Sequence, residues 1–193
     1  MITNEKIYEN KMRYLDLLGK LGIDLTEICK YLDAIDFFNK PMSSNSYYAY
    51  RGGLCEYSLK VCFALGDLSN AYFPGKYSKE DLIKVALFKD VYRAELYEVY
   101  AKNIKNEATN AWETEEAFRV VDASKRPTFG DIGFSSYMIM KNFIDFTDEQ
   151  TLAICNSRNV NGPDSHEVMR SYQLVALTHM ADCVASFIYA EGE

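Results

Sequence analysis

The sequence predicts a mainly α-helical bundle that carries a small β-hairpin. Apolar residues recur at intervals of three and four along most of the chain, which is the period of one face of a helix. Capping and turn residues divide this pattern into segments of ordinary helix length. One stretch departs from it, because two short segments flank the turn-forming residues 108–110. At 193 residues the chain fits one domain, expected over 1–193.

The first 41 residues predict a pair of helices. The first covers residues 5–20, and glycines 19 and 22 lie on either side of its end. Asp24 is placed to cap a second helix over 25–38, which Pro41 follows. We therefore expect an N-terminal helical pair over 1–41 and a core over 42–190.

Two long helices are predicted at the centre of the chain. A loop rich in Ser and Tyr over 42–51 leads into a helix over 53–72. Ser78, with an acidic residue three positions later, predicts the capped start of a second helix reaching about residue 102. Asp90 lies on the apolar stripe of that helix, where a carboxylate is costly unless it is paired or binds a cation. The sequence leaves both a structural ion pair and a cation site open.

The rest of the chain predicts the hairpin and three more helices. The expected segments are a small β-hairpin or meander with strands at 104–107 and 111–113 and a further β segment at 118–121, a loop at 126–130, helices at 135–146 and 147–156, a polar loop at 156–164, and a last helix at 165–190. A helical turn over 113–118 stays open as an alternative. Asp182 lies on one face of that last helix.

Composition limits the function classes. A net charge of −7 argues against a general nucleic-acid-binding surface, and no apolar run is long enough to span a membrane. The N-terminus does not resemble a signal peptide, so we expect a cytoplasmic protein. Five cysteines without a C-x-x-C motif favour free thiols over disulfides or thiolate zinc. Two histidines are too few for a mechanism that needs several imidazoles.

Several blocks carry a family resemblance. They are Tyr-Ala-Tyr-Arg-Gly-Gly-Leu-Cys-Glu-Tyr-Ser at 48–58, the segment 85–93 around Lys89-Asp90, the hairpin, Phe-Gly-Asp-Ile-Gly at 129–133, residues 146–154, and Leu-Thr-His-Met-Ala-Asp at 177–182. In composition and order they resemble the HD-domain proteins of the metal-dependent phosphohydrolase superfamily, closest to the small single-domain forms often carried by phages and mobile elements. The resemblance covers about residues 42–190 and implies an HD-like helical bundle.

The departures from that family concern its metal ligands. Tyrosines 48 and 57 stand where the family has histidines, and Lys89 stands at the histidine of its His-Asp pair. Asp131 or Ile132 replaces the loop histidine, and Asn156, Ser157 or Arg158 replaces the next one. Only Asp90 and Asp182 remain of the metal-binding set. The resemblance therefore implies a pocket that was retained while metal-dependent hydrolysis was lost, with no bound metal and no cofactor.

The first expectation for function is a pseudoenzyme that binds a nucleotide, another phosphate-bearing ligand or a protein partner. Aromatic faces would receive a base and cations would receive phosphates. The expected ligand-binding residues are Tyr48, Tyr50, Arg51, Tyr57, Lys60, Lys89, Arg93, Arg158 and Asp182. An equally weighted interpretation is that the tyrosines only fill the vacated site.

Two alternatives stay open. One is a metal-dependent phosphohydrolase or phosphodiesterase in which Asp90 and Asp182 are catalytic, helped by Asp131 and by His179 or His166. The other is a protein-interaction module with an acidic outer face.

The geometry behind the first expectation is specific. We expect the residual pocket between the start of the 53–72 helix, the middle of the next helix and the last helix. We also expect Lys89, Asp90 and Asp182 to form a buried charge network, in which the ammonium group replaces the metal.

Overall fold

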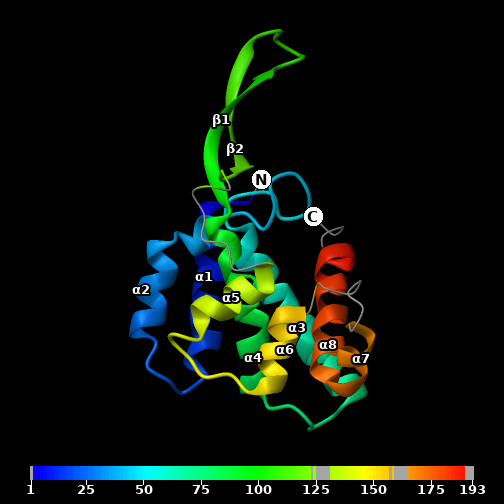
Figure 1. Ribbon diagram of the computed structural model, residues 1–193. Coiled ribbons are helices and arrows are strands. Elements are labelled where there is room, and N and C mark those ends of the chain that lie inside the picture. The colour runs from blue at the N-terminus through cyan, green and yellow to red at the C-terminus, as the bar shows by residue number, and fades with distance from the viewer. Residues whose placement is uncertain (1, 123, 125–130, 157, 159–164, 190–193) are drawn as a thin grey trace.

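The structure, a computed structural model, describes residues 2–122, 124, 131–156, 158 and 165–189, and these residues form eight α-helices and one two-stranded antiparallel sheet (Figure 1). The α-helices are α1 (Asn4–Gly19), α2 (Thr26–Ala34), α3 (Gly53–Tyr72), α4 (Lys79–Phe88), α5 (Ile132–Met140), α6 (Asp148–Asn156), α7 (Ser165–Ser171) and α8 (Gln173–Cys183). Two short 3-10 helices, η1 (Phe37–Asn39) and η2 (Val91–Glu95), and a π-helical turn, η4 (Val184–Ile188), join them. The mainly α fold with one hairpin is as predicted, and none of the described helices is long and apolar enough to cross a membrane.

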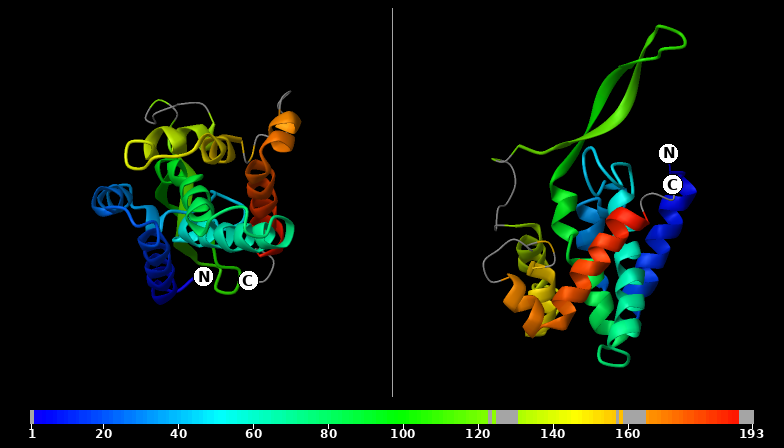
Figure 2. Two further views of the ribbon diagram at one scale, coloured as in Figure 1. Left: turned by 90° about the horizontal axis from the view of Figure 1, so that it is seen from below. Right: turned by 90° about the vertical axis from the view of Figure 1, so that its right-hand side faces the viewer.

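Helix α3 is the central element. It contacts α1, α4 and α8, and the view from below in Figure 2 shows these helices beside it. Its bounds match the prediction, and apolar side chains on several sides are fully buried, as expected for a helix surrounded by others. At its first turn a Cβ on Gly53 would lie 2.2 Å from the Tyr48 carbonyl oxygen. Only glycine lets the 42–52 loop pack so closely on the start of α3.

Two hydrophobic clusters flank α3. The first joins α1, α2 and η1 to α3 and α4, and within it the buried Tyr14 hydroxyl donates to the Leu87 carbonyl at 2.8 Å. The second joins α3 and α4 to α6 and α8 through side chains such as Val61, Leu65 and Leu174. Helix α4 contributes side chains to both clusters. Its start is fixed by the predicted capping box, in which Ser78 Oγ accepts from the Asp81 backbone N–H.

The predicted helix from 78 to about 102 is wrong beyond Phe88. The chain leaves the helix at Asp90 (φ −118°, ψ 10°), makes the turn η2 and enters strand β1 (Tyr97–Lys105). The backbone bonding changes here to 3-10 spacing, with the Arg93 N–H donating to the Asp90 carbonyl at 2.9 Å, and the Asp90 side chain accepts from Lys89 and Arg93. The apolar residues that predicted one continuous helix are buried in three successive elements, α4, η2 and β1.

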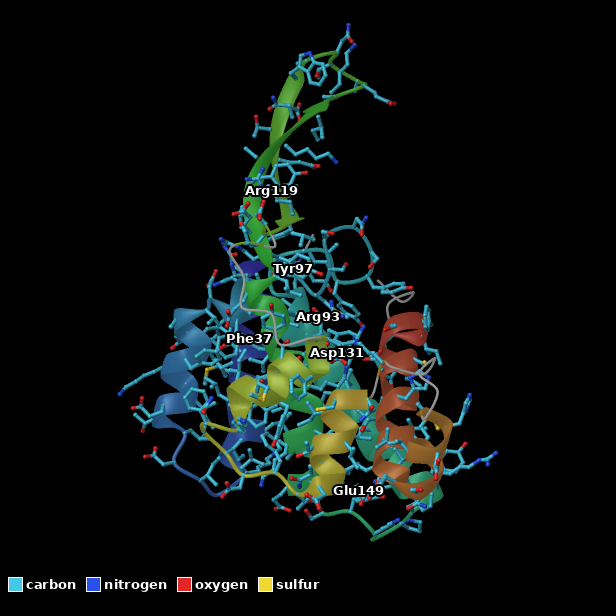
Figure 3. All side chains as sticks on the ribbon, in the orientation of Figure 1. Phe37, Arg93, Tyr97, Arg119, Asp131 and Glu149 are labelled. Carbon is cyan, nitrogen blue, oxygen red and sulfur yellow. The ribbon has the colours of Figure 1, made fainter. Side chains whose placement is uncertain are left out.

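The predicted last helix is also divided. It breaks at Tyr172 (φ −127°, ψ 96°), and the Leu174 N–H donates to Glu149 of α6 at 3.2 Å. The carboxylate of Glu149, from helix α6, therefore caps the start of α8. The sequence around residue 172 does not contain this signal. Figure 3 labels Glu149 beside this junction.

Smaller corrections concern residues 126–164. Helix α5 runs over Ile132–Met140 instead of 135–146, because Asp131 caps it by accepting from the Phe134 N–H at 2.8 Å. The prediction of α6 is confirmed, with Thr147 as a cap that accepts from Gln150 N–H. The loop predicted at 126–130 lies outside the described residues, as does most of the loop at 156–164.

The hairpin is longer than predicted and projects from the helices (Figure 1). β1 pairs with β2 (Trp112–Val120) over nine residues each, from Tyr97 opposite Val120 to Lys105 opposite Trp112. The turn lies where the sequence placed it, since Asn106 Oδ1 accepts from the Ala108 N–H at 3.0 Å.

Candidate functional site

A buried cluster of charged side chains forms where α3, the end of α4 and α8 meet. Tyr57 comes from the first turns of α3, Lys89 and Asp90 follow α4, and Asp182 lies near the end of α8. These elements are held together by the second hydrophobic cluster, so the polar groups lie at the edge of a packed core. The three segments are those that the sequence predicted to meet.

Lys89 is at the centre of this cluster. Its side chain is 1% exposed, and its Nζ donates to Asp90 Oδ2 and to Asp182 Oδ1. The same ammonium group lies 5.3 Å from the centre of the Tyr57 ring, a cation–π contact. The predicted network of Lys89, Asp90 and Asp182 is confirmed: one ammonium bridges both carboxylates.

Two arginines complete the charge pairing. Arg93 donates through Nε to Asp90 Oδ1 at 2.8 Å and through Nη1 to the Met42 carbonyl at 3.2 Å. Arg158 donates through Nη2 to Asp182 Oδ1 at 2.9 Å, and its Nε lies 3.5 Å from Asp90 Oδ1. The Arg158 side chain is 33% exposed, against 9% for Arg93. Arg158 is thus the cation of this cluster that reaches solvent.

Tyr57 connects the carboxylate and the arginine. Its fully buried hydroxyl donates to Asp182 Oδ1, accepts from Arg158 Nη2 at 2.8 Å, and lies 3.4 Å from Ser186 Oγ. Burial and the nearby carboxylates of Asp182 and Asp90 hold the pKa of Tyr57 well above its usual value. The hydroxyl therefore stays neutral at physiological pH.

The charges of the cluster do not cancel. Burial alone would raise the pKa of Asp90, but the cations of Arg158, Lys89 and Arg93 outweigh it and hold that pKa well below its usual range. With Tyr57 neutral, three cations face the two carboxylates of Asp90 and Asp182. Among these residues one positive charge is left over, and Arg158, with its side chain 33% exposed, is the cation nearest to solvent.

Of the other predicted ligand-binding residues, the two tyrosines lie in the cluster or beside it. Tyr48 belongs to the site: its ring centre lies 5.4 Å from that of Tyr57, and its hydroxyl donates to the Ala185 carbonyl at 3.1 Å. Tyr50 adjoins Tyr48 at 6.1 Å, but its hydroxyl donates to Glu56.

Arg51 and Lys60 do not join the cluster. Arg51 pairs with Glu116 of the hairpin at 3.6 Å and borders a groove of about 370 Å³ along α1. Lys60 lies 5.5 Å from the Tyr189 ring centre and borders a smaller cavity beside α1. These contacts, to the hairpin and to Tyr189, differ from those of the Lys89 network, and ligand binding by Arg51 and Lys60 stays a prediction.

The alternative metal-binding set is not brought together. Asp131 caps α5, His179 Nε2 lies 3.8 Å from Cys183 Sγ, and His166 is exposed at the start of α7. Within the part of the chain that the structure describes, no group of three His, Cys, Asp or Glu residues is arranged to hold a metal ion.

One residue of the cluster was not predicted. Ser186 contacts the Tyr57 hydroxyl and lies four residues after Asp182. Helical spacing from Asp182 places it on the same face, and this was the signal available.

Comparison of the chain with known protein families, with characterised proteins and with solved structures gave no match. The function is therefore inferred from the cluster and from the residues that build it.

Proposed function

We propose that this protein is a catalytically inactive, HD-domain-like protein that binds a phosphate-bearing ligand, such as a nucleotide, without hydrolysing it. The observation that carries the proposal is the position of Lys89, whose ammonium bridges Asp90 and Asp182. The blocks that resemble the HD family contribute Tyr57, Lys89-Asp90 and Asp182, and these side chains contact one another in the fold.

The donor set argues against metal-dependent hydrolysis. Both remaining carboxylates already bind Lys89 and an arginine, and a divalent cation would have to displace these charges. Tyr48 and Tyr57 occupy the positions of family histidines, and a neutral phenol is a poor ligand for the transition metals that imidazole binds. We therefore expect this site to bind its ligand without hydrolysing it.

The excess charge supports an anion as the ligand. Guanidinium groups bind phosphate oxygens through paired hydrogen bonds, and Arg158 is the cluster cation that is reachable from solvent. A phosphate group at Arg158 would offset the unbalanced positive charge of the cluster. Tyr48 and Tyr57 are buried, so the structure favours contacts to the phosphate over stacking of a base on these rings.

Binding is tested by thermal shift and calorimetry with inorganic phosphate, nucleoside triphosphates and cyclic nucleotides. We expect at least one of them to raise the melting temperature, and Arg158→Ala to abolish the effect. Arg170→Ala, on the exposed side of α7, is the matched control and should leave binding unchanged. No shift with any phosphate compound would refute ligand binding.

Hydrolysis is tested separately by elemental analysis and by phosphatase and phosphodiesterase assays with added Mn²⁺ or Mg²⁺. We expect no stoichiometric transition metal and no turnover. About one metal per chain, with activity that Asp90→Asn removes, would instead establish the metal-dependent phosphohydrolase.

A further inference from the structure

The groove of about 370 Å³ along α1 is separate from the buried charge cluster, and none of its lining residues belongs to that cluster. Asn4, Ile7, Tyr8 and Lys11 form one wall, because residues three and four apart share a face of a helix. The end of α2, the turn η1 and Arg51 line the rest. The volume is near the lower end of the range of about 300–1,000 Å³ for small-molecule sites, which favours a small ligand.

Part of the groove lining is apolar. Ile7 is half-buried, and the neighbouring Tyr8 ring is exposed, so both offer surface to a ligand. Phe38 is buried beneath Lys11, whose ammonium lies 4.6 Å from the centre of its ring. Aromatic and aliphatic groups of this kind receive an apolar side chain of a ligand, while a few polar groups fix its orientation.

Two carboxylates line the groove, and one of them lacks a cationic partner. Asp33 pairs with Lys11 at 2.8 Å, so these two charges offset each other. Asp36 accepts only from the neutral amide of Asn39, at 2.6 Å, and takes part in no ion pair with a described residue. Asp36 can therefore bind a cationic group of a ligand.

Arg51 supplies the complementary positive charge. Its Nε lies 3.6 Å from Glu116 Oε1, which is longer than a hydrogen bond. Among the residues that the structure describes, its two Nη groups have no hydrogen-bond partner. A guanidinium binds a carboxylate best through two parallel N–H···O bonds. The contact with Glu116 is not of this kind, so Arg51 retains the capacity to bind the carboxylate of a ligand.

We propose that this groove binds a free amino acid or dipeptide with a large apolar side chain. Its carboxylate binds Arg51, its ammonium group binds Asp36, and its side chain packs on Ile7 and Tyr8. The four charged side chains of the lining sum to zero, so a zwitterion leaves the groove neutral, whereas a nucleotide or a polyamine would not. This inference is independent of the phosphate ligand proposed for the charge cluster.

Binding is tested by calorimetry with L-phenylalanine and with the dipeptide L-alanyl-L-phenylalanine. We expect at least one of them to bind. N-acetylation and C-terminal amidation should each weaken that binding by at least about tenfold, because each removes one charged end of the ligand. If neither compound binds, or if the capped derivatives bind equally well, the proposal is overturned.

Substitutions test the two ends of the groove separately. Arg51→Ala and Asp36→Asn should each weaken binding by at least about tenfold. Asparagine tolerates the left-handed backbone of Asp36 (φ 55°), so the second variant keeps the turn. Glu116→Gln removes the competing carboxylate from Arg51 and should strengthen binding by about two- to fivefold. Arg13→Ala, on an exposed part of α1 outside the groove, is the control and should bind like the wild type.

Equal melting temperatures of the four variants verify that they fold. If Arg51→Ala and Asp36→Asn bind the ligand as tightly as the wild type, or if Glu116→Gln fails to strengthen binding, the placement of the ligand in this groove is wrong.

Discussion

Replacement of Lys89 by alanine tests the buried cluster most directly. The lysine side chain is 1% exposed, and its ammonium donates to two carboxylates that are themselves 2% and 11% exposed. The substitution removes both charge-assisted hydrogen bonds and leaves Asp90 and Asp182 facing each other. Like charges in a poorly solvated site repel and raise each other's pKa.

The magnitude follows from these contacts. Each charge-assisted hydrogen bond contributes about 1.5–3 kcal/mol, so the gross loss is about 3–6 kcal/mol. Arg93 and Arg158 still face the carboxylates and recover part of it. We therefore expect Lys89→Ala to lower the free energy of unfolding by about 3–5 kcal/mol, the usual range for breaking a buried pair. For a chain of this length the melting temperature should fall by about 6–20 °C.

Urea denaturation followed by circular dichroism measures this loss. Lys79→Ala, an exposed lysine at the start of the same helix, is the control and should change stability by less than about 0.5 kcal/mol. A loss for Lys89→Ala that is as small as the control would refute the reasoning. It would mean that water or the arginines satisfy the two carboxylates without the ammonium group.

Three further predictions concern the same region. Tyr57→Phe should lower the free energy of unfolding by about 1–3 kcal/mol in urea, because Asp182 and Arg158 lose their shared hydroxyl partner; an unchanged value would show that the hydroxyl is dispensable. Gly53→Ala should destabilise by more than about 2 kcal/mol, since its Cβ would meet the Tyr48 carbonyl at 2.2 Å. Gly66→Ala, with no atom within 4 Å, should instead stabilise α3 by up to about 1 kcal/mol, and similar effects at both sites would contradict the packing of the loop on α3. The pKa of Asp90 is lower in the folded protein than the value of about 3.9 in the unfolded chain, so its stabilising contribution is present above about pH 4 and is lost as the pH falls through the folded-state pKa. Lys89→Ala raises that pKa, and in an acid titration followed by circular dichroism its unfolding midpoint should move to higher pH than the wild type's; a midpoint at or below the wild type's would reject this assignment.

The sequence by itself determined the elements that local signals specify. The Gly-Gly start and apolar period of α3, the capping box of Ser78 and the turn at 108–110 each encode structure within a few residues. The buried carboxylates could also be predicted, because a charged residue on an apolar stripe needs a partner. Lys89 could be named as that partner because it precedes Asp90 and has a long flexible side chain.

Tertiary structure decided where those local patterns end. The apolar period around Asp90 continues past Phe88, but the ion pairs at Asp90 and the pairing of β1 with β2 end the helix there. Helix α8 begins at Gln173 because Glu149, 24 residues before Gln173 in the chain, supplies a cap. Arg51 and Lys60 have the same charge as Lys89, yet they turn toward Glu116 and Tyr189. Charge and period are properties of the sequence, whereas the direction in which a side chain leaves the fold depends on which elements pack beside it.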